Sequence, residues 1–180
     1  MSDLVKTSKF LSYVLRHEPE AIGLTLDPQG WAEIDNLLLL ANNAGTPIDR
    51  ATFDVIVATS AKKRFTISKD GVRVRAAQGH STPAVAIEHR EAVPPPRLFH
   101  GTAERFLPPI REEGLIAGNR HHVHLTENKA IALDCGRRYG KGVSLTIDSA
   151  RMYVAGYRFF ISENSVWLTV AVPPEFIDEL

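Results

Sequence analysis

The chain has 180 residues, of which 44% are hydrophobic and 23% charged, a composition typical of a folded globular protein rather than a disordered one. Basic and acidic residues number 21 each, so the net charge of zero gives no general affinity for nucleic acid, and any anion site must come from local clustering. The single cysteine, Cys135, excludes an internal disulfide and fits a reducing compartment. No apolar run approaches about 18 residues and no signal-peptide core is present, so we expect a cytoplasmic protein without membrane contact.

The N-terminal segment is predicted to form an amphipathic helix. Apolar residues repeat at helical spacing over residues 11–15, and Pro19 marks the point where the helix should end. This places Arg16 and His17 side by side in its last turn. A cation there is favoured by the helix dipole alone. A guanidinium also offers a planar fork for phosphate oxygens, and a histidine can donate a hydrogen bond or a proton, so both explanations stay open.

Two further helices are predicted before residue 61. Residues 32–45 show helical spacing with a stop at Gly45. Residues 46–60 follow, with Thr46 as the predicted N-cap and Pro47 at the first helical position.

A basic β-hairpin is predicted next. Residues 64–76 alternate apolar and polar side chains around the turn sequence Lys69-Asp70-Gly71. Three helices followed by a hairpin outline a winged helix, which is often a nucleic-acid-binding module. Residues 62–75 hold six basic residues and one acidic residue, a net charge of +5. These charges suit either a solvated hairpin or a surface that contacts phosphates.

The second half of the chain is predicted to be rich in strands. Residues 79–97 end in a proline run and read as a connector, within which Val85–Ile87 is a candidate short strand. We therefore expect an α+β fold, with lobes over residues 1–78 and 98–180. Strands are predicted at 97–102, 121–126, 142–148, 157–162 and 165–172, and helices at 103–114 and 127–140.

Histidines in the second half suggest two kinds of site. His122 and His124 would share one face of a strand, with His121 on the other, but two ligands on one face do not complete a zinc site, so we expect no metal. The sequence His100-Gly101-Thr102 ends a predicted strand, where a glycine would let a ligand approach the backbone closely. The glycine-rich motifs of Rossmann dehydrogenases and P-loop NTPases are absent, as is the nucleophile elbow of α/β-hydrolases.

Six short motifs together resemble one family, the RNA 2′-phosphotransferases, which remove an internal 2′-phosphate from RNA using NAD⁺. In chain order they are "LSYVLRHEP", "GWAEIDNLL", "KKRF", "FHGT", "NRHHVHLT" and "ENSVWLT". Each is modest alone, but the ordered set is specific and covers nearly the whole chain. The resemblance implies an N-terminal winged-helix RNA lobe followed by a strand-rich lobe of the ADP-ribosyltransferase type.

The resemblance also implies a catalytic set of three arginines and one histidine. By motif these are Arg16, His17, Arg64 and Arg120, and all four are present. The first three would hold the 2′-phosphate, and Arg120 would reach it from the other lobe, so that the site lies in a cleft between lobes. This explains why an arginine and a histidine stand side by side in the last turn of the first predicted helix.

By the same resemblance, the second lobe would bind NAD⁺ as a co-substrate. One wall of the pocket would be formed by His100, Gly101 and Thr102, and the other by His124, Leu125 and Thr126. Weaker candidates, for which a solvated surface position is the simpler explanation, are Glu127, Asn128, Asp134 and Arg138. Asn119 would help shape the turn that presents Arg120, and the glutamate that protein-modifying ADP-ribosyltransferases often use is not assigned to Glu163.

The implied reaction has two steps. The RNA 2′-phosphate attacks C1″ of NAD⁺ and expels nicotinamide, which leaves an ADP-ribosylated RNA 2′-phosphate. The ribose 2″-hydroxyl then attacks the phosphorus and releases 2′-hydroxyl RNA and ADP-ribose 1″,2″-cyclic phosphate. Two alternatives remain at this stage: an ADP-ribosyltransferase acting on nucleic-acid ends or protein, and a non-catalytic winged-helix binder that senses a nucleotide. We expect a monomer, with RNA bearing a 2′-phosphate as its partner.

Overall fold

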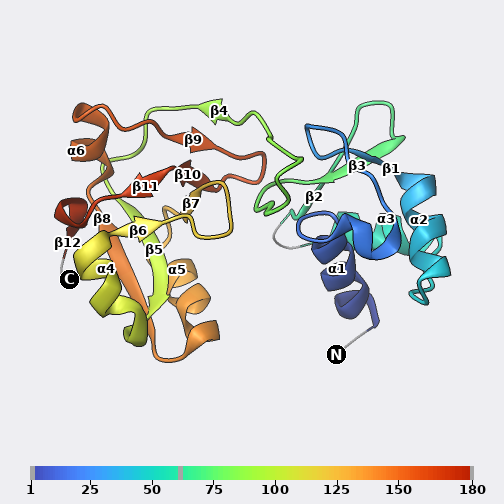
Figure 1. The fold of residues 1–180 in the computed structure, drawn as a ribbon, viewed down its shortest axis with the longest axis horizontal. Coiled ribbons are helices and arrows are strands. Elements are labelled where there is room, and N and C mark those ends of the chain that lie inside the picture. The colour runs from blue at the N-terminus through green and yellow to red at the C-terminus, as the bar shows by residue number, and fades with distance from the viewer. Residues whose placement is uncertain (1–2, 61–62, 179–180) are drawn as a thin grey trace. The chain divides into compact units, whose positions relative to one another are not determined.

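The computed structural model describes residues 3–60 and 63–178 and divides the chain into two compact units, residues 1–88 and 89–180 (Figure 1). The first ten residues of the expected connector, 79–88, belong to unit 1, and the rest opens unit 2. Both units combine helices and strands, so the chain is a mixed α/β protein.

Unit 1 packs three helices against a small antiparallel sheet. Its helices are α1 (Asp3–Val14), α2 (Ile34–Asn43) and α3 (Arg50–Thr59), with a 3-10 turn, η1, at Pro19–Ile22. The sheet has the order β1 (Ala32–Glu33), β3 (Arg73–Ala76), β2 (Phe65–Ile67). Strands β2 and β3 form the predicted hairpin, in the register Phe65↔Ala76 to Ile67↔Val74. The core holds apolar residues of every helix and of the inner sheet face, among them Leu11, Leu15, Ile34, Leu37, Phe53 and Val74.

Four local predictions in unit 1 are wrong, and the last of them concerns the start of α3. Helix α1 ends at Val14, so Arg16 and His17 lie in the turn after it, where both amides donate to the Tyr13 carbonyl. The first two residues of the predicted second helix form strand β1 instead. No strand forms at residues 85–87, and the nearest strand in the described chain is β4 (Arg90–Glu91).

The third helix starts later than predicted. Its N-cap is Asp49, whose carboxylate accepts a hydrogen bond from the Thr52 amide at 2.7 Å, so Thr46 is not the cap. The Thr46 amide instead donates to the Ala41 carbonyl at 2.9 Å, and Gly45 has φ of +82°. This pattern closes the preceding helix, so Thr46 completes α2 rather than beginning α3.

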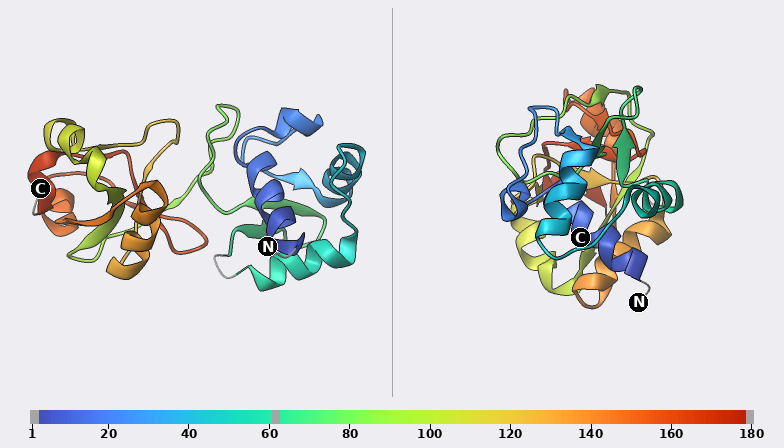
Figure 2. Two further views of the ribbon diagram at one scale, coloured as in Figure 1. Left: turned by 90° about the horizontal axis from the view of Figure 1, so that it is seen from below. Right: turned by 90° about the vertical axis from the view of Figure 1, so that its right-hand side faces the viewer.

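Unit 2 contains four-, three- and two-stranded antiparallel sheets with three helices around them (Figures 1 and 2). The four-stranded sheet has the order β4, β9 (Phe160–Ile161), β10 (Trp167–Thr169), β7 (Val123–Leu125). The three-stranded sheet has the order β12 (Ile177–Asp178), β8 (Gly142–Ile147), β5 (Leu98–Ala103). The two-stranded sheet pairs β11 (Ala171–Val172) with β6 (Leu115–Ile116). The helices are α4 (Leu107–Glu113), α5 (Lys129–Gly136) and α6 (Ser149–Val154), with 3-10 turns η2 (Glu104–Phe106), η3 (Arg137–Tyr139) and η4 (Pro174–Phe176). Four of the five predicted strands of this half are confirmed, whereas the fifth, 165–172, is divided into β10 and β11, which lie in different sheets. Helix α6 was not predicted.

Helix α5 packs on β5 and β8 with its backbone very close to the strand. A Cβ at Gly101 would lie 1.8 Å from the Ala132 carbonyl oxygen, and one at Gly136 would lie 2.1 Å from the Thr102 carbonyl oxygen. The space beside Gly101 is therefore filled by the helix. The expectation that its missing side chain admits a ligand is wrong on this face of the strand.

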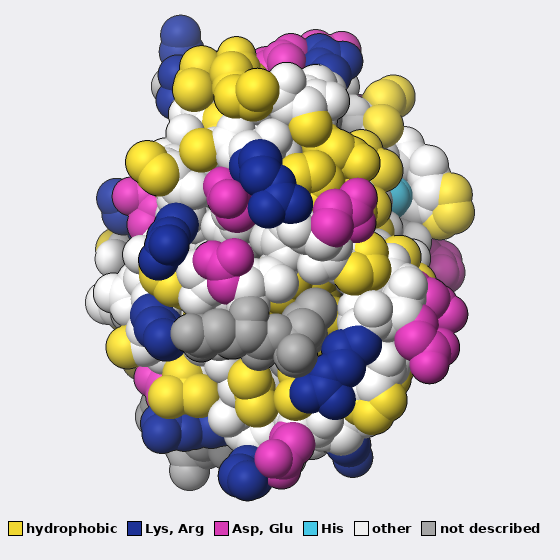
Figure 3. All heavy atoms as spheres, turned by 90° about the vertical axis from the view of Figure 1, so that its left-hand side faces the viewer, with side chains coloured by type: hydrophobic (Ala, Val, Ile, Leu, Met, Phe, Trp, Pro, Cys, Tyr) yellow, Lys and Arg dark blue, Asp and Glu magenta, His cyan; other side chains and the backbone are white. Residues whose placement is uncertain are grey.

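The surface of unit 2 around the C-terminal end of the chain carries mixed charge. Figure 3 shows basic and acidic side chains interspersed there with apolar ones rather than gathered by sign. Among the described residues, no helix is long and apolar enough to cross a membrane.

Candidate active site

In unit 1, one chain segment forms hydrogen bonds to three of the four predicted catalytic residues. The Ala77 amide donates to the Arg64 carbonyl at 2.9 Å, and the Ser81 amide donates to the Arg16 carbonyl at 2.9 Å. The Ser81 hydroxyl also bonds Nδ1 of His17 at 2.9 Å. Arg16, His17 and Arg64, which are far apart in sequence, therefore lie along the segment 77–81.

The side chains of this cluster are anchored and partly buried. Nη1 of Arg64 donates to the Ser8 hydroxyl of α1 at 3.3 Å, and Ser8 is only 7% exposed. Arg16 is half-buried with a buried Nε atom, and the His17 ring lies 6.0 Å from the Tyr13 ring. Guanidinium groups held at a partly dry surface attract an anion more strongly than fully solvated ones. The cluster is thus suited to hold a phosphate.

In unit 2, a chain of hydrogen bonds connects the fourth predicted catalytic residue to two histidines. Nη1 of Arg120 lies 2.8 Å from Nδ1 of His124, and Nδ1 of His100 lies 2.9 Å from the His124 carbonyl oxygen. A guanidinium only donates and a carbonyl only accepts. Nδ1 of His124 must therefore accept, with that ring neutral, and Nδ1 of His100 must carry a proton. The Arg120 guanidinium is thereby held beside His124.

The two predicted walls of the NAD⁺ pocket meet at a pair of backbone bonds. The Phe99 amide donates to the Thr126 carbonyl at 2.8 Å, and the Thr126 amide donates back to the Phe99 carbonyl at 2.9 Å. This bridge joins β5 to the end of β7. His100 follows Phe99, and His124 lies two residues before Thr126. The bridge therefore brings the two histidines together.

Not every residue of the two walls has a side chain free for a ligand. Leu125 is 1% exposed and packs in the core of unit 2, and Thr102 is 6% exposed. Gly101 lies against α5, as described above. The polar groups best placed for a ligand are therefore on His100, His124 and Thr126, all of them half-buried.

The weaker candidates have local structural roles or lie at the surface. Glu127 accepts a hydrogen bond from the indole Nε1 of Trp167 at 2.8 Å, and Asn128 caps α5 through bonds from the amides of residues 130 and 131. Asp134 pairs with Arg137 at the surface at 2.9 Å. Three others are exposed: Asn119, Arg138 and Glu163.

The histidines considered for a metal have aromatic neighbours. The His122 ring lies 6.0 Å from the His89 ring and 5.8 Å from the Phe160 ring. Among residues 3–60 and 63–178, no group of three or more His, Cys, Asp or Glu side chains is arranged to hold a metal ion.

Sequence reasoning missed the residues that position the cluster in unit 1. Ser8 and Ser81 are 56 and 64 residues away from the side chains that they bond, Arg64 and His17. No local pattern marks them, because a serine that anchors another side chain looks like any surface serine until the fold brings the two together.

Burial lowers the pKa of His100 below its ordinary value of 6.5, and the positive charge of Arg120 adds to this effect. The hydrogen bond to the His124 carbonyl opposes the shift but does not cancel it. His100 is therefore neutral at pH 7.

This shift predicts how the stability of unit 2 depends on pH. As the pH falls, the unfolded chain takes up a proton at His100 at a higher pH than the folded chain does. The contribution of neutral His100 to the free energy of unfolding is therefore fully present above about pH 6.5 and is lost as the pH falls below it. We expect the free energy of unfolding, measured with urea, to fall less steeply between pH 7 and pH 5 in His100→Asn than in the unmodified protein. Burial also lowers the pKa of His122, so His122→Asn serves as a parallel variant that removes the separate contribution of His122 to this pH dependence. Equal slopes in His100→Asn and the unmodified protein would contradict the assignment.

Comparison with known proteins identifies the family of this chain. A family model described as "RNA 2'-phosphotransferase, Tpt1 / KptA family" matches residues 2–171. A "Probable RNA 2'-phosphotransferase" of Pseudomonas aeruginosa is 58% identical over 173 residues, which cover 96% of this chain and 95% of the relative. Proteins with the same description from Pseudomonas syringae pv. tomato and Escherichia coli are 54% and 53% identical, covering 96% and 98% of this chain and 92% and 96% of their own lengths. The chain therefore belongs to the RNA 2′-phosphotransferase, Tpt1/KptA family.

Proposed function

We propose that this protein removes an internal 2′-phosphate from RNA and consumes NAD⁺ as the acceptor co-substrate. The observation that carries the proposal is the gathering of Arg16, His17 and Arg64 along the segment 77–81, in a chain that belongs to this family. In this proposal unit 1 is a winged-helix RNA lobe and unit 2 is an NAD⁺ lobe of the ADP-ribosyltransferase type.

Arg16 and Arg64 are assigned to the 2′-phosphate. A phosphomonoester has a second pKa of about 6, so it is already an anionic nucleophile at neutral pH and needs no general base. What it needs is a fixed position relative to the carbon that it attacks. Two guanidinium groups, one of them bonded to a buried serine of α1, provide that position.

The polar groups of unit 2 fit a dinucleotide. Nδ1 of neutral His100 already donates to the His124 carbonyl, which leaves Nε2 as the acceptor for a ribose hydroxyl. The Thr126 side chain, half-buried at the bridge between β5 and β7, is a second polar contact. Arg120 adds a positive charge next to both histidines. NAD⁺ supplies an electrophilic C1″ and a neutral leaving group, nicotinamide.

In the first step, Arg16 and Arg64 hold the phosphate while one of its oxygens forms a bond to C1″. The bond from C1″ to the nicotinamide nitrogen breaks, and its electron pair leaves with nicotinamide. In the second step, the ribose 2″-hydroxyl attacks phosphorus, and the bond from phosphorus to the RNA 2′-oxygen breaks. The proton lost by the 2″-hydroxyl balances the proton gained by the RNA oxygen.

His17 and Arg120 are assigned to the second step. Charge builds up on the phosphorus oxygens as the hydroxyl attacks, and a guanidinium stabilises that charge. The Ser81 hydroxyl holds Nδ1 of His17, which fixes the orientation of the ring. We assign Nε2 of His17 as the donor of the proton to the departing RNA 2′-oxygen.

An RNA oligonucleotide with one internal 2′-phosphate tests the proposal. It is mixed with the purified protein, with and without NAD⁺, and both 2′-hydroxyl RNA and released nicotinamide are measured. We expect NAD⁺-dependent formation of both products, with loss of at least about 100-fold in rate in Arg16→Ala. The matched control is Arg111→Ala, which removes an exposed arginine of α4 and should retain full activity. Nicotinamide release with the phosphate retained in an ADP-ribosylated adduct would instead assign the protein as an ADP-ribosyltransferase. Absence of both products would contradict the proposal.

A further inference from the structure

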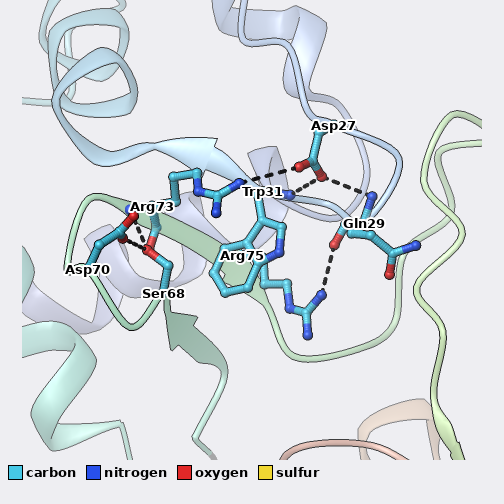
Figure 4. A network of polar contacts seen from close by, with 7 residues as sticks. All are labelled: Asp27, Gln29, Trp31, Ser68, Asp70, Arg73 and Arg75. Atoms are coloured by element: carbon cyan, nitrogen blue, oxygen red, sulfur yellow. Dashed lines mark hydrogen bonds and ion pairs between the residues drawn. The ribbon is translucent and has the colours of Figure 1, made fainter.

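The outer face of the sheet in unit 1 carries an aromatic side chain with two arginines against it. The guanidinium carbon of Arg75 lies 4.4 Å from the centre of the Trp31 ring, and that of Arg73 lies 5.6 Å from it. Figure 4 shows both side chains beside the indole. These are cation–π contacts. We call the three residues the Trp31 platform.

The alternation of strand β3 explains why this group faces outward. Val74 and Ala76 are fully buried and point into the core of unit 1, so Arg73 and Arg75 point to the opposite face. Trp31 immediately precedes Ala32, which pairs with Val74 across the sheet. The indole thus lies on the same face as the two arginines.

Several hydrogen bonds hold the loop that carries Trp31. One carboxylate oxygen of Asp27 accepts hydrogen bonds from the Gln29 and Trp31 amides, both at 2.9 Å, and the Asp27 amide donates to the Trp31 carbonyl at 3.0 Å. Arg75 donates through Nη1 to the Gln29 carbonyl at 3.2 Å. Figure 4 shows this network around the indole. The guanidinium groups are therefore held in place before any ligand arrives.

The charge of Arg73 is only weakly balanced. The Gln29 carbonyl and the indole, which have no net charge themselves, orient Arg75. Arg73 pairs with Asp27 at the long distance of 3.9 Å, with both side chains more than 40% exposed. Asp70, the acidic residue of the hairpin, is engaged by the turn itself, through the Ser68 hydroxyl at 2.5 Å and the Val72 amide at 3.1 Å. The face is thus complementary to a polyanion.

We propose that the Trp31 platform binds the phosphodiester backbone of the RNA strand that flanks the 2′-phosphate. The inference rests on the proposed function, because that function makes RNA the polyanion concerned. Guanidinium groups are planar and form paired hydrogen bonds to phosphate oxygens, and an aromatic surface beneath them holds them in position. A base next to a bound phosphate can stack on the outer face of the same guanidinium plane. A sheet face of this kind adds affinity for the RNA strand, whereas other residues hold the 2′-phosphate that reacts.

The test compares a short RNA with a long one. The short RNA is a dinucleotide carrying the 2′-phosphate, and the long one has about 12 nucleotides with the same phosphate inside. Dissociation constants are measured by fluorescence polarisation without NAD⁺, at several salt concentrations, for Trp31→Phe, Arg73→Gln and Arg75→Gln. Arg111→Gln, an exposed charge of unit 2, is the matched control. Thermal unfolding of each variant verifies that it is folded, and Trp31→Phe preserves an aromatic ring in case a larger change disrupts the loop.

We expect each arginine variant to weaken binding of the long RNA by about tenfold and to reduce its salt dependence by roughly one phosphate contact, with less than a twofold change for the dinucleotide. The control should bind both RNAs as the unmodified protein does. Equal binding of the long RNA by folded Arg73→Gln and Arg75→Gln would overturn the inference, as would an equal loss for both RNAs. Because binding is measured without NAD⁺, a failure of the proposed reaction is seen separately, as absence of turnover in the unmodified protein.

Discussion

Arg120→Ala should reduce kcat/KM for 2′-phosphate removal by about 100-fold to 1,000-fold, because a positioned donor aimed at developing charge contributes an effect of this size. The loss should appear mainly in kcat, since the charge that we propose Arg120 to stabilise is greatest in the transition state. The measurement is a steady-state rate series with the 2′-phosphorylated oligonucleotide at saturating NAD⁺. Arg120 is exposed, so the variant should unfold at an unchanged temperature.

His124 provides the control for this prediction, because it holds Arg120 through Nδ1 at 2.8 Å. His124→Ala removes the acceptor and should lower kcat by roughly tenfold, less than the loss of Arg120 itself. His124→Asn retains a side-chain acceptor and should recover much of that rate. Full activity in Arg120→Ala would exclude the arginine from the chemistry. Equal losses in His124→Ala and His124→Asn would show that His124 does not act by positioning Arg120.

Gly101→Ala should destabilise unit 2 by about 3 kcal/mol or more. This is at or above the upper end of the destabilisation that an extra methylene group in a packed core usually causes. The new Cβ would lie 1.8 Å from the Ala132 carbonyl oxygen. The oxygen belongs to the backbone and the Cβ is fixed by its bond to Cα, so neither can rotate away. The strand or helix α5 must shift as a whole. Urea unfolding followed by tryptophan fluorescence measures the loss. A Trp31→Phe background makes Trp167, which is buried in unit 2, the reporter.

Gly118→Ala is the matched control in the same unit. Gly118 has φ of +60°, and a Cβ there would meet nothing within 4 Å, so only the left-handed backbone conformation is penalised, by about 1 kcal/mol. A similar loss in both variants would contradict the explanation from close packing. So would a Gly101→Ala protein as stable as the unmodified one.

The sequence predicted the elements of unit 1 and unit 2 well where a periodic pattern was long. The hairpin of residues 64–76 was correct in both strands and in its turn, because alternation and an Asp-Gly turn agree there. Helix α6 was missed, since its six residues are too few for a helical period to show. The start of α3 was misplaced because Thr46 and Asp49 are both good caps, and only the fold decides that Thr46 completes α2.

The candidate site was predicted by motif, whereas its supporting contacts were not. The motifs gave Arg16, His17 and Arg64, and the structure gathers these three along one segment. What no pattern could supply is the serine at each anchor, or that the glycine at residue 101 serves helix packing. Contacts between residues so distant in sequence are determined by tertiary packing, which leaves no local periodicity.

The bridge between Phe99 and Thr126 has a mechanical consequence for unit 2. A thermal fluctuation that separates His100 from His124 must break both bonds of the bridge and the bond from Nδ1 of His100 together. The two strands are thereby coupled, so that they move together rather than independently. Arg120 is bonded to His124 and is therefore tied to the same body, although the residues 118–121 that carry it are exposed.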